Sequence, residues 1–284
     1  MIIIERPGPL TTVQDLGRPG LAHLGVGRSG AADRASLTLA NRLVGNDEGA
    51  ACLEITLGGL VARFERAATV ALTGAAAVVR LDGIEQAMSA PLAVRAGATL
   101  ALGVPAHGIR TYLAVRGGLD VPPVLGSRST DLLAGLGPDP VRPGTRIPVG
   151  NTLLPYPGVD VAAVAGPPRD PVLRIYAGPR DDWFGAEALA VLCTQPYEVS
   201  PASDRVGLRL TGPPLARSRS EELPSEGMVE GALQVPPDGE PVLFLADHPV
   251  TGGYPVIAVV EPADIPIAAQ SRPGDRLRFQ LSRL

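Results

Sequence analysis

The chain has 284 residues, enough for two domains, and a formal net charge of −4. This acidic balance argues against a nucleic-acid surface, which needs a basic excess. All 25 basic residues are arginine, so the chain can carry no Schiff-base lysine, no phosphate-loop lysine and no biotinylated lysine. Any nucleotide or biotin chemistry would therefore need another chain.

The composition predicts a core-forming protein with many turns. Apolar residues make up 45% of the chain, while 34 Gly and 30 Pro limit the length of helices. The charge at Glu5 comes too early for a signal peptide, and the uncharged run at 67–79 is shorter than the ~18 residues of a membrane span. Cys52 and Cys193 lie among apolar residues, which favours free, buried thiols. We therefore expect a cytoplasmic protein without a membrane or nucleic-acid partner.

Strand-like segments bounded by turn residues run through the chain. Residues 69–73 end at a glycine, and residues 77–81 end at Asp82-Gly83, a dipeptide typical of hairpins. Further segments of this kind are 110–115, 173–176, 241–246 and 256–260. Short strands at this spacing are typical of a barrel or a sandwich, so the predicted fold class is mainly β.

Helical patterns are few and short. Residues 33–44 place Leu37, Ala40 and Val44 on one face, with Asp33 as the N-cap and a glycine just beyond the end. Residues 182–192 are a second candidate. Neither is long enough to dominate the fold, so both are interpreted as covers of a β structure.

A passage poor in charge and rich in Pro and Gly, residues 151–171, is interpreted as the connection between two domains. We expect the domains at 1–165 and 166–284, with a short strand at 159–164. A Pro-Gly turn precedes a strand-like run at both 142–147 and 272–277. A duplicated β domain would explain this echo, and so would chance recurrence of turn chemistry.

No standard metal or catalytic motif is present. The three histidines, His23, His107 and His248, lack the spacing of metal ligands, and the two cysteines do not complete a set. The nucleophile elbow, the P-loop and the dinucleotide fingerprint are also missing from the sequence. We therefore predict no metal site on this chain.

The first polar loop, residues 11–18, could bind an amide-like ligand. Gln14, Asp15 and Arg18 offer an amide, a carboxylate and a guanidinium within five positions, which suits a planar group with donors and acceptors. A strand-exit turn with a local Asp–Arg pair is the alternative interpretation.

The polar loops of the C-terminal half are predicted to line one cleft, since loops at strand ends gather at one rim of a barrel. Asp204 and Glu226 are the candidate proton-transfer groups. Gly252 and Gly253 would let the backbone approach a substrate oxygen. The remaining predicted substrate-binding residues there are Arg205, Ser225, Gln234, Thr251 and Tyr254. An ordinary turn or hairpin loop remains the alternative at each position.

Nine segments resemble, in order, the family of the C-type subunit of 5-oxoprolinase, also named allophanate hydrolase subunit 2 or biotin-dependent carboxyltransferase, which includes the antagonist of a sporulation kinase inhibitor. They are TTVQDLGR (11–18), SGAADR (29–34), ANRLVGND (40–47), LEITLGG (53–59), PVLGSRST (123–130), GPRDDWF (178–184), SDRVGLRL (203–210), SEGMVEGALQVPPDG (225–239) and LADHPVTGGYP (245–255). His248-Pro249-Val250 departs from the family pattern, which leaves the substrate contacts there open.

The resemblance implies two cyclophilin-like β-barrel domains with a few short helices. It also implies a smaller partner, similar to allophanate hydrolase subunit 1 or to the B-type subunit of 5-oxoprolinase, and a third, lactam-handling subunit. The activity implied first is ATP-dependent opening of 5-oxoproline to glutamate, in which this hydrolase subunit works on a C–N bond only within the complex. ATP and Mg²⁺ would be bound by, or shared with, the partner chains, and no biotin would be attached to this chain.

Two other functions remain open on the same resemblance. One is an allophanate hydrolase or a biotin-dependent, urea-type carboxyltransferase subunit, which would need biotin delivered by another protein. The other is a non-catalytic regulator that sequesters its partner subunit.

Overall fold

The computed structural model describes residues 1–219 and 221–282, and the chain forms two compact units. The first unit consists of Met1–Arg18, Ser29–Asp131 and Gly135–Pro167. The second consists of Pro19–Arg28, Leu132–Ala134 and Pro168–Leu284. The passage from one unit to the other thus falls after residue 167, while the sequence placed it after residue 165. Two short segments from the first half of the chain belong to the second unit.

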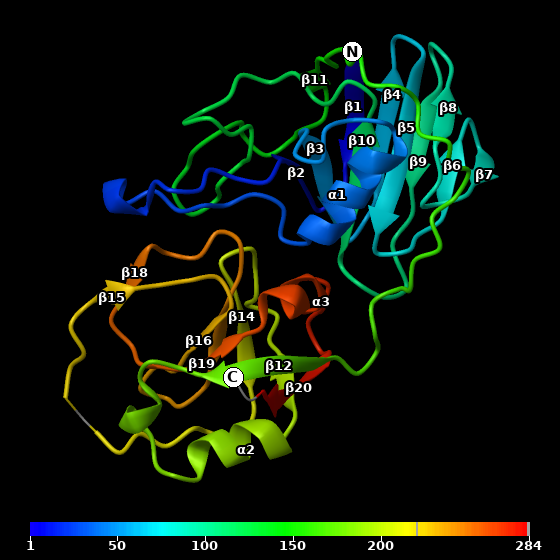
Figure 1. The fold of residues 1–284 in the computed structure, drawn as a ribbon. Coiled ribbons are helices and arrows are strands. Elements are labelled where there is room, and N and C mark those ends of the chain that lie inside the picture. The colour runs from blue at the N-terminus through cyan, green and yellow to red at the C-terminus, as the bar shows by residue number, and fades with distance from the viewer. Residues whose placement is uncertain (220, 283–284) are drawn as a thin grey trace. The chain divides into compact units, whose positions relative to one another are not determined.

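The first unit is built from two β-sheets (Figure 1). The six-stranded sheet has the order β11 (Arg146–Ile147), β1 (Ile2–Pro7), β4 (Leu60–Phe64), β9 (Thr99–Leu102), β6 (Val79–Leu81) and β7 (Ile84–Gln86). The five-stranded sheet has the order β2 (Leu10–Gln14), β3 (Cys52–Thr56), β10 (Arg110–Val115), β5 (Ala68–Gly74) and β8 (Leu92–Val94). All of their strand pairs are antiparallel.

Aliphatic side chains hold the first unit together. In β4, Leu60, Ala62 and Phe64 are buried while the residues between them are partly exposed, which is the period-two pattern of a half-buried strand. The strand β10 is buried along its whole length. Helix α1 (Arg34–Leu43) packs against β10 and β5. Its N-cap is Asp33, which accepts from the backbone N–H of Ser36 at 2.9 Å, as the sequence predicts.

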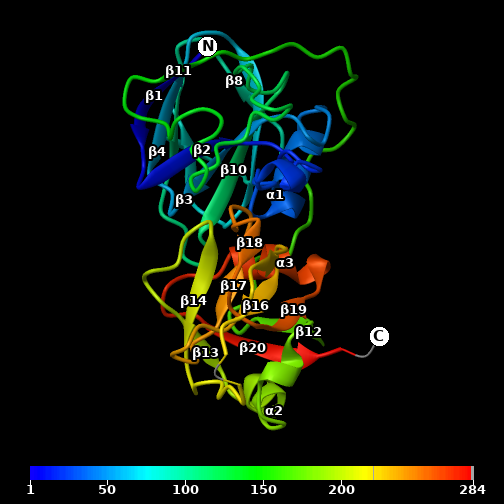
Figure 2. The same ribbon diagram turned by 90° about the vertical axis from the view of Figure 1, so that its left-hand side faces the viewer.

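The second unit contains a closed seven-stranded barrel (Figure 2). Its order is β12 (Val172–Ala177), β19 (Val256–Val260), β16 (Ala232–Gln234), β17 (Val242–Phe244), β14 (Gly207–Thr211), β13 (Tyr197–Val199) and β20 (Arg276–Leu281). Parallel pairing of β12 with β20 closes the barrel, and the other pairs are antiparallel. In β20 the side chains alternate, with Leu277 and Phe279 in the core and Arg276 and Arg278 exposed.

Short elements complete the second unit. They are a two-stranded ladder, β15 (Glu226–Gly227) with β18 (Thr251–Gly252); the helices α2 (Ala188–Thr194) and α3 (Ile265–Ala269); and the 3₁₀ turns η1 (Ala22–Leu24), η2 (Asp181–Trp183) and η3 (Pro262–Asp264). Helix α2 packs against β20. The prediction of a mainly β chain with a few short helices is confirmed. No helix within 1–219 or 221–282 is long and apolar enough to cross a membrane.

Two local predictions need correction. The strand expected at 159–164 is wrong, because this described segment contains no strand and Ala162 donates its backbone N–H to Ser89 in an isolated contact. Pro155 and Pro157, just before it, lack the backbone N–H that a strand would donate. The helix expected at 182–192 is broken, since η2 ends at Trp183 and α2 begins at Ala188, with Gly185 between them.

Each unit contains one of the two Pro-Gly turns, and the two turns have the same local geometry. Gly144 donates to the carbonyl of Ile4 at 2.7 Å, and Gly274 donates to that of Val199 at 2.8 Å. Each turn leads directly into a strand, β11 or β20, as the sequence predicts. Their φ angles of 85° and 89° require glycine in both turns.

Candidate functional site

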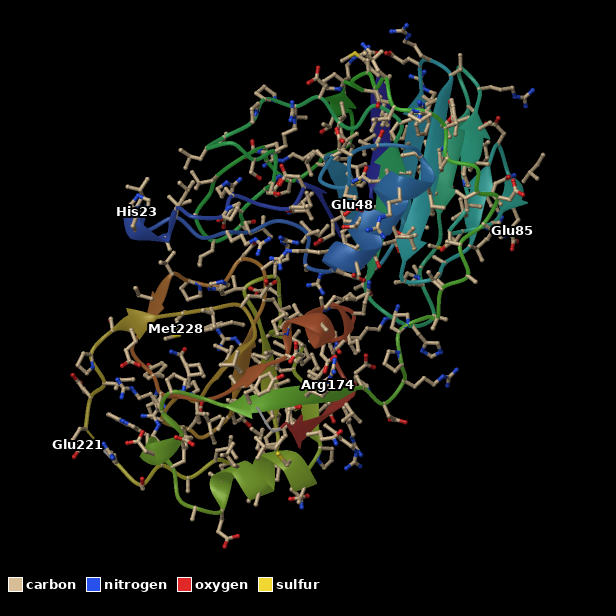
Figure 3. The ribbon with its side chains drawn as sticks, in the orientation of Figure 1. His23, Glu48, Glu85, Arg174, Glu221 and Met228 are labelled. Carbon is tan, nitrogen blue, oxygen red and sulfur yellow. The ribbon has the colours of Figure 1, made fainter. Side chains whose placement is uncertain are left out.

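A cavity of about 840 Å³ opens in the second unit, and we call it the second-unit cavity. Its walls come from four separate stretches of chain: Trp183, the loop 214–223 without residue 220, the turn 237–239, and 253–255. Glu221, labelled in Figure 3, lies on the loop that forms one wall. The volume lies within the roughly 300–1,000 Å³ typical of small-molecule sites.

An irregularity of the barrel brings two walls of this cavity together. The register of β16 and β19 shifts at Gln234, so this residue pairs with Val256. The Gln234 side chain donates to the carbonyl of Tyr254 at 3.0 Å, and the N–H of Val235 donates to the carbonyl of Pro255 at 3.0 Å. Gln234 therefore fixes the backbone of Tyr254 at the cavity wall.

The wall that contains Arg217 and Ser218 is positioned by backbone pairing with the end of η2. Arg217 forms a bridge with Phe184, and the N–H of Ser218 donates to the carbonyl of Trp183 at 2.9 Å. The guanidinium of Arg217 donates to the carbonyl of Val235, and its central carbon lies 5.6 Å from the centre of the Tyr254 ring. These contacts fix a cation beside an aromatic ring.

Arg217 has capacity left for a ligand. Its Nε atom is buried and has no hydrogen-bond partner among the described residues. Burial lowers the pKa of the Arg217 guanidinium, but arginine still remains charged at neutral pH. A fixed guanidinium at the cavity wall suits a carboxylate or a carbonyl oxygen.

The two glycines of the TGGYP segment differ in what surrounds them. A Cβ at Gly252 would lie 2.6 Å from the side-chain nitrogen of Gln234 and 3.2 Å from Met228, so a larger residue there would displace the Gln234 amide that donates to Tyr254. A Cβ at Gly253 would meet only the carbonyl of Leu223, at 3.6 Å. Gly253 lines the second-unit cavity, and its small size leaves that space open.

Ser225, Glu226 and Thr251 do not line the cavity. In the β15–β18 ladder, Glu226 pairs with Gly252 and Gly227 pairs with Thr251. The carboxylate of Glu226 accepts from Nε of Arg180 at 2.9 and 3.1 Å. The hydrogen bond from Arg180 lowers the pKa of Glu226, which weakens it as a base.

Asp204 and Arg205 also stand outside the cavity wall. Asp204 is exposed and accepts from the backbone N–H groups of Val206 and Gly207 at 2.8 and 3.2 Å, as in an Asx turn. Arg205 is buried and forms two 3.0 Å hydrogen bonds with Asp247. Of the residues predicted for the C-terminal cleft, Gly253 and Tyr254 line the cavity, and Gln234 supports it. The catalytic roles of Asp204 and Glu226 stay predictions.

Asp15, in the first unit, is saturated by local donors. Its carboxylate accepts from the hydroxyls of Ser127 and Ser129 at 2.6 and 2.5 Å. It also accepts from the backbone N–H groups of Gly17 and Arg128 at 2.7 and 2.6 Å. These four bonds account for its burial without a ligand.

Gln14 and Arg18, in the same loop, are not saturated. Gln14 donates to Thr12 and to the carbonyl of Thr130, while its amide oxygen is buried and has no partner in the described part of the chain. Arg18 donates to the carbonyl of Ser129 at 2.5 Å, and its Nη1 lies 3.8 Å from the Asp131 carboxylate. Its Nε and Nη1 have no hydrogen-bond partner among the described residues.

The sequence reasoning missed several cavity residues. Trp183 and Asp238 lie within segments that carry the family resemblance, and a polar or aromatic residue beside a turn was the available signal. Arg217 lies in the stretch TGPPLARSR (211–219), which carries no motif, so only the pairing with Phe184 reveals it. Among the described residues, no group of three or more His, Cys, Asp or Glu side chains could hold a metal ion.

Comparison with solved structures defines the class of this protein. The crystal structure of TTHA0988 matches with a TM-score of 0.90 and 38% identity, over 98% of this chain and 55% of that chain. The chain thus spans about half of that longer protein. Residues 24–281 match the family described as "Carboxyltransferase domain, subdomain A and B".

The chain belongs to this carboxyltransferase-domain family. It is 40% identical to the C-type subunit of 5-oxoprolinase from Escherichia coli (strain K12) over 282 residues, which cover 98% of this chain and 90% of that protein. It is 34% identical to urea amidolyase of Saccharomyces cerevisiae over 306 residues, which cover 98% of this chain but only 16% of that protein.

Proposed function

We propose that the chain is the C-type subunit of an ATP-dependent 5-oxoprolinase complex and that the second-unit cavity receives the substrate. The observation that carries this proposal is the convergence of family segments on the cavity. GPRDDWF supplies Trp183, the VPPDG turn supplies Asp238, and TGGYP supplies Gly253 and Tyr254. The identity to the 5-oxoprolinase relative supports the choice of substrate class.

The lining suits a small cyclic amide that carries a carboxylate. Arg217 lines the cavity beside the Tyr254 ring, so its guanidinium can bind the carboxylate or the lactam oxygen. Asp238, on the turn 237–239, can accept from an amide N–H. The chain has no lysine, so we assign ATP and Mg²⁺ to partner chains. A smaller partner and a lactam-handling partner would complete the enzyme.

Gly253→Val tests the cavity directly. An added Cβ would lie 3.6 Å from the carbonyl oxygen of Leu223, an ordinary contact, and the valine side chain would occupy space at the cavity wall. We expect substrate-dependent ATP hydrolysis by the complex reconstituted with its neighbouring subunits to fall by about 10²-fold. The melting temperature of the isolated chain should stay unchanged.

Gly185→Val is the matched control. Gly185 lies in the same unit, outside the cavity wall, with nothing within 4 Å of an added Cβ. It should leave both activity and melting temperature unchanged. A Gly253→Val complex with normal turnover would overturn the assignment of the cavity, whatever the complex hydrolyses.

A biotin-dependent carboxyltransferase is the second candidate, favoured by the family description and the urea amidolyase relative. In that reaction the cavity would take a ureido group in place of a lactam. Incubating the complex with 5-oxoproline, urea or allophanate, with and without a biotinylated carrier, separates the two functions. ATP hydrolysis that depends on 5-oxoproline and not on the carrier supports the first proposal, and the reverse pattern supports the second.

A further inference from the structure

A second cavity, of about 590 Å³, lies within the first unit, and we call it the first-unit cavity. Three arginines line it, Arg66, Arg95 and Arg116, and no lining residue is acidic. We propose that this cavity binds a small multivalent anion that carries phosphoryl or carboxylate groups. The proposal is independent of the reaction, because it concerns a different unit from the second-unit cavity.

Strand register explains why the arginines gather. In the five-stranded sheet β10, β5 and β8 are neighbours, with Val115 opposite Val70 and Ala68 opposite Val94. Arg116 directly follows β10, Arg95 directly follows β8, and Arg66 precedes β5 by two residues. Three adjacent strands therefore carry an arginine at the same end of the sheet.

One of the three arginines is immobilised by the fold. Arg116 donates to the carbonyls of Val44 and Gly45 at 2.8 and 3.3 Å and also to that of Leu154. Its guanidinium carbon lies 3.9 Å from the centre of the Tyr156 ring. These contacts hold a cation and an aromatic ring rigidly in the cavity wall, which reduces the entropy lost when a ligand binds.

The other two arginines are available for a ligand. Arg66 and Arg95 are exposed, and the side chain of neither makes a hydrogen bond or ion pair with a described residue. The turns that carry Arg66 and Arg95 are joined, because the backbone N–H of Gly97 donates to the carbonyl of Phe64 at 2.7 Å. Guanidinium groups bind phosphate and carboxylate oxygens in pairs. A concave wall with one sign of charge concentrates anions, and a bound anion relieves the repulsion among the three cations.

Calorimetric titration of the full chain with inorganic pyrophosphate and with citrate tests the proposal. We expect saturable binding of one anion per chain, weakened by added salt. Arg66→Glu and Arg95→Glu should each weaken binding at least about tenfold, the loss of one charged hydrogen bond. Binding of pyrophosphate alone would identify phosphoryl ligands, and binding of citrate alone would identify polycarboxylates.

Arg80→Glu is the control, because Arg80 is an exposed arginine on β6 that does not line the cavity. It changes the net charge equally and should leave the affinity unchanged. The proposal is overturned if Arg80→Glu weakens binding as much as Arg66→Glu, or if neither anion binds at millimolar concentration. Binding of a glutamate-rich peptide with neither small anion would also overturn it, in favour of a protein partner.

Discussion

Each unit buries an arginine beside an aspartate, but the two arginines are satisfied to different degrees. Arg205, in the second unit, makes two 3.0 Å hydrogen bonds to Asp247, and both side chains are almost fully buried. Arg18, in the first unit, is equally buried but stands 3.8 Å from Asp131. Two of its nitrogens have no hydrogen-bond partner among the described residues.

The difference separates a structural arginine from one with binding capacity. The bidentate pair with Asp247 uses two of the five guanidinium N–H groups of Arg205, and none of its nitrogens is buried without a partner among the described residues. An unpaired buried donor costs roughly 1–3 kcal/mol, so a fold that keeps one has a reason, such as a water or a ligand that takes the free N–H groups. Of the two arginines predicted to bind substrate, Arg18 is therefore the better candidate.

The largest expected effect comes from breaking the satisfied pair. Arg205→Met leaves the Asp247 carboxylate buried without its cation, so we expect the second unit to lose about 3–5 kcal/mol of unfolding free energy. Trp183, the single tryptophan, lies in this unit and reports its unfolding by fluorescence during urea denaturation. Arg209→Met, at an exposed position on β14, is the control and should cost far less. Equal losses for both variants would contradict the structural role of the pair.

Replacing the unsatisfied arginine, Arg18, should change stability little. Arg18→Met removes two unpaired donors together with the bond to Ser129, so the losses and gains offset one another and stability should change by less than about 1 kcal/mol. Activity of the reconstituted complex should fall at least about tenfold if the free nitrogens bind substrate. Far-UV circular dichroism during urea denaturation measures the first quantity. A stability loss as large as that of Arg205→Met would place Arg18 among the structural residues.

The sequence predicted correctly the caps and turns that depend on contacts between residues close together in the chain. The Asp33 cap predicts α1 because the cap and its N–H partner lie three residues apart. Asp82 and Gly83, with φ angles of 50° and 83°, form the hairpin turn between β6 and β7 that their dipeptide predicts. The mainly β class follows from many such local signals.

The sequence did not reveal which residues that lie far apart in the chain contact one another. Asp204 is the sequence neighbour of Arg205, yet the partner of Arg205 is Asp247, 42 residues further on. Gly252 and Gly253 look alike in the sequence, but only the structure shows that the first is closely packed against the side chains of Gln234 and Met228. No local pattern carries information of this kind.

A smaller loss of stability is expected from breaking a third arginine–aspartate pair, Arg174 with Asp264, in which the arginine is exposed. Arg174 donates to Asp264 at 2.9 Å from Nε and at 2.7 Å from Nη2, and about half of its side chain is exposed to solvent. Solvent screens this pair, so Arg174→Met should cost much less stability than Arg205→Met. The same fluorescence-detected urea denaturation compares the two, and equal costs would mean that burial does not set the value of these pairs.

The smallest expected effect is the change with pH of the unfolding free energy that the Arg174–Asp264 pair contributes. The hydrogen bond from Arg174 lowers the pKa of Asp264 in the folded state. Its stabilisation is therefore fully present above the ordinary aspartate pKa of about 4 and is lost as the pH falls through the lower, folded-state value. The difference in unfolding free energy between the wild type and Asp264→Asn should be constant from pH 7 to about pH 5 and should shrink below about pH 4. Arg174→Met should lose most of this pH-dependent part, because it removes the cation, while the backbone N–H of residue 174 still donates to Asp264 and still lowers its pKa. A difference that grows towards acid pH would mean that Asp264 is protonated more readily in the folded chain, against the geometry of the pair.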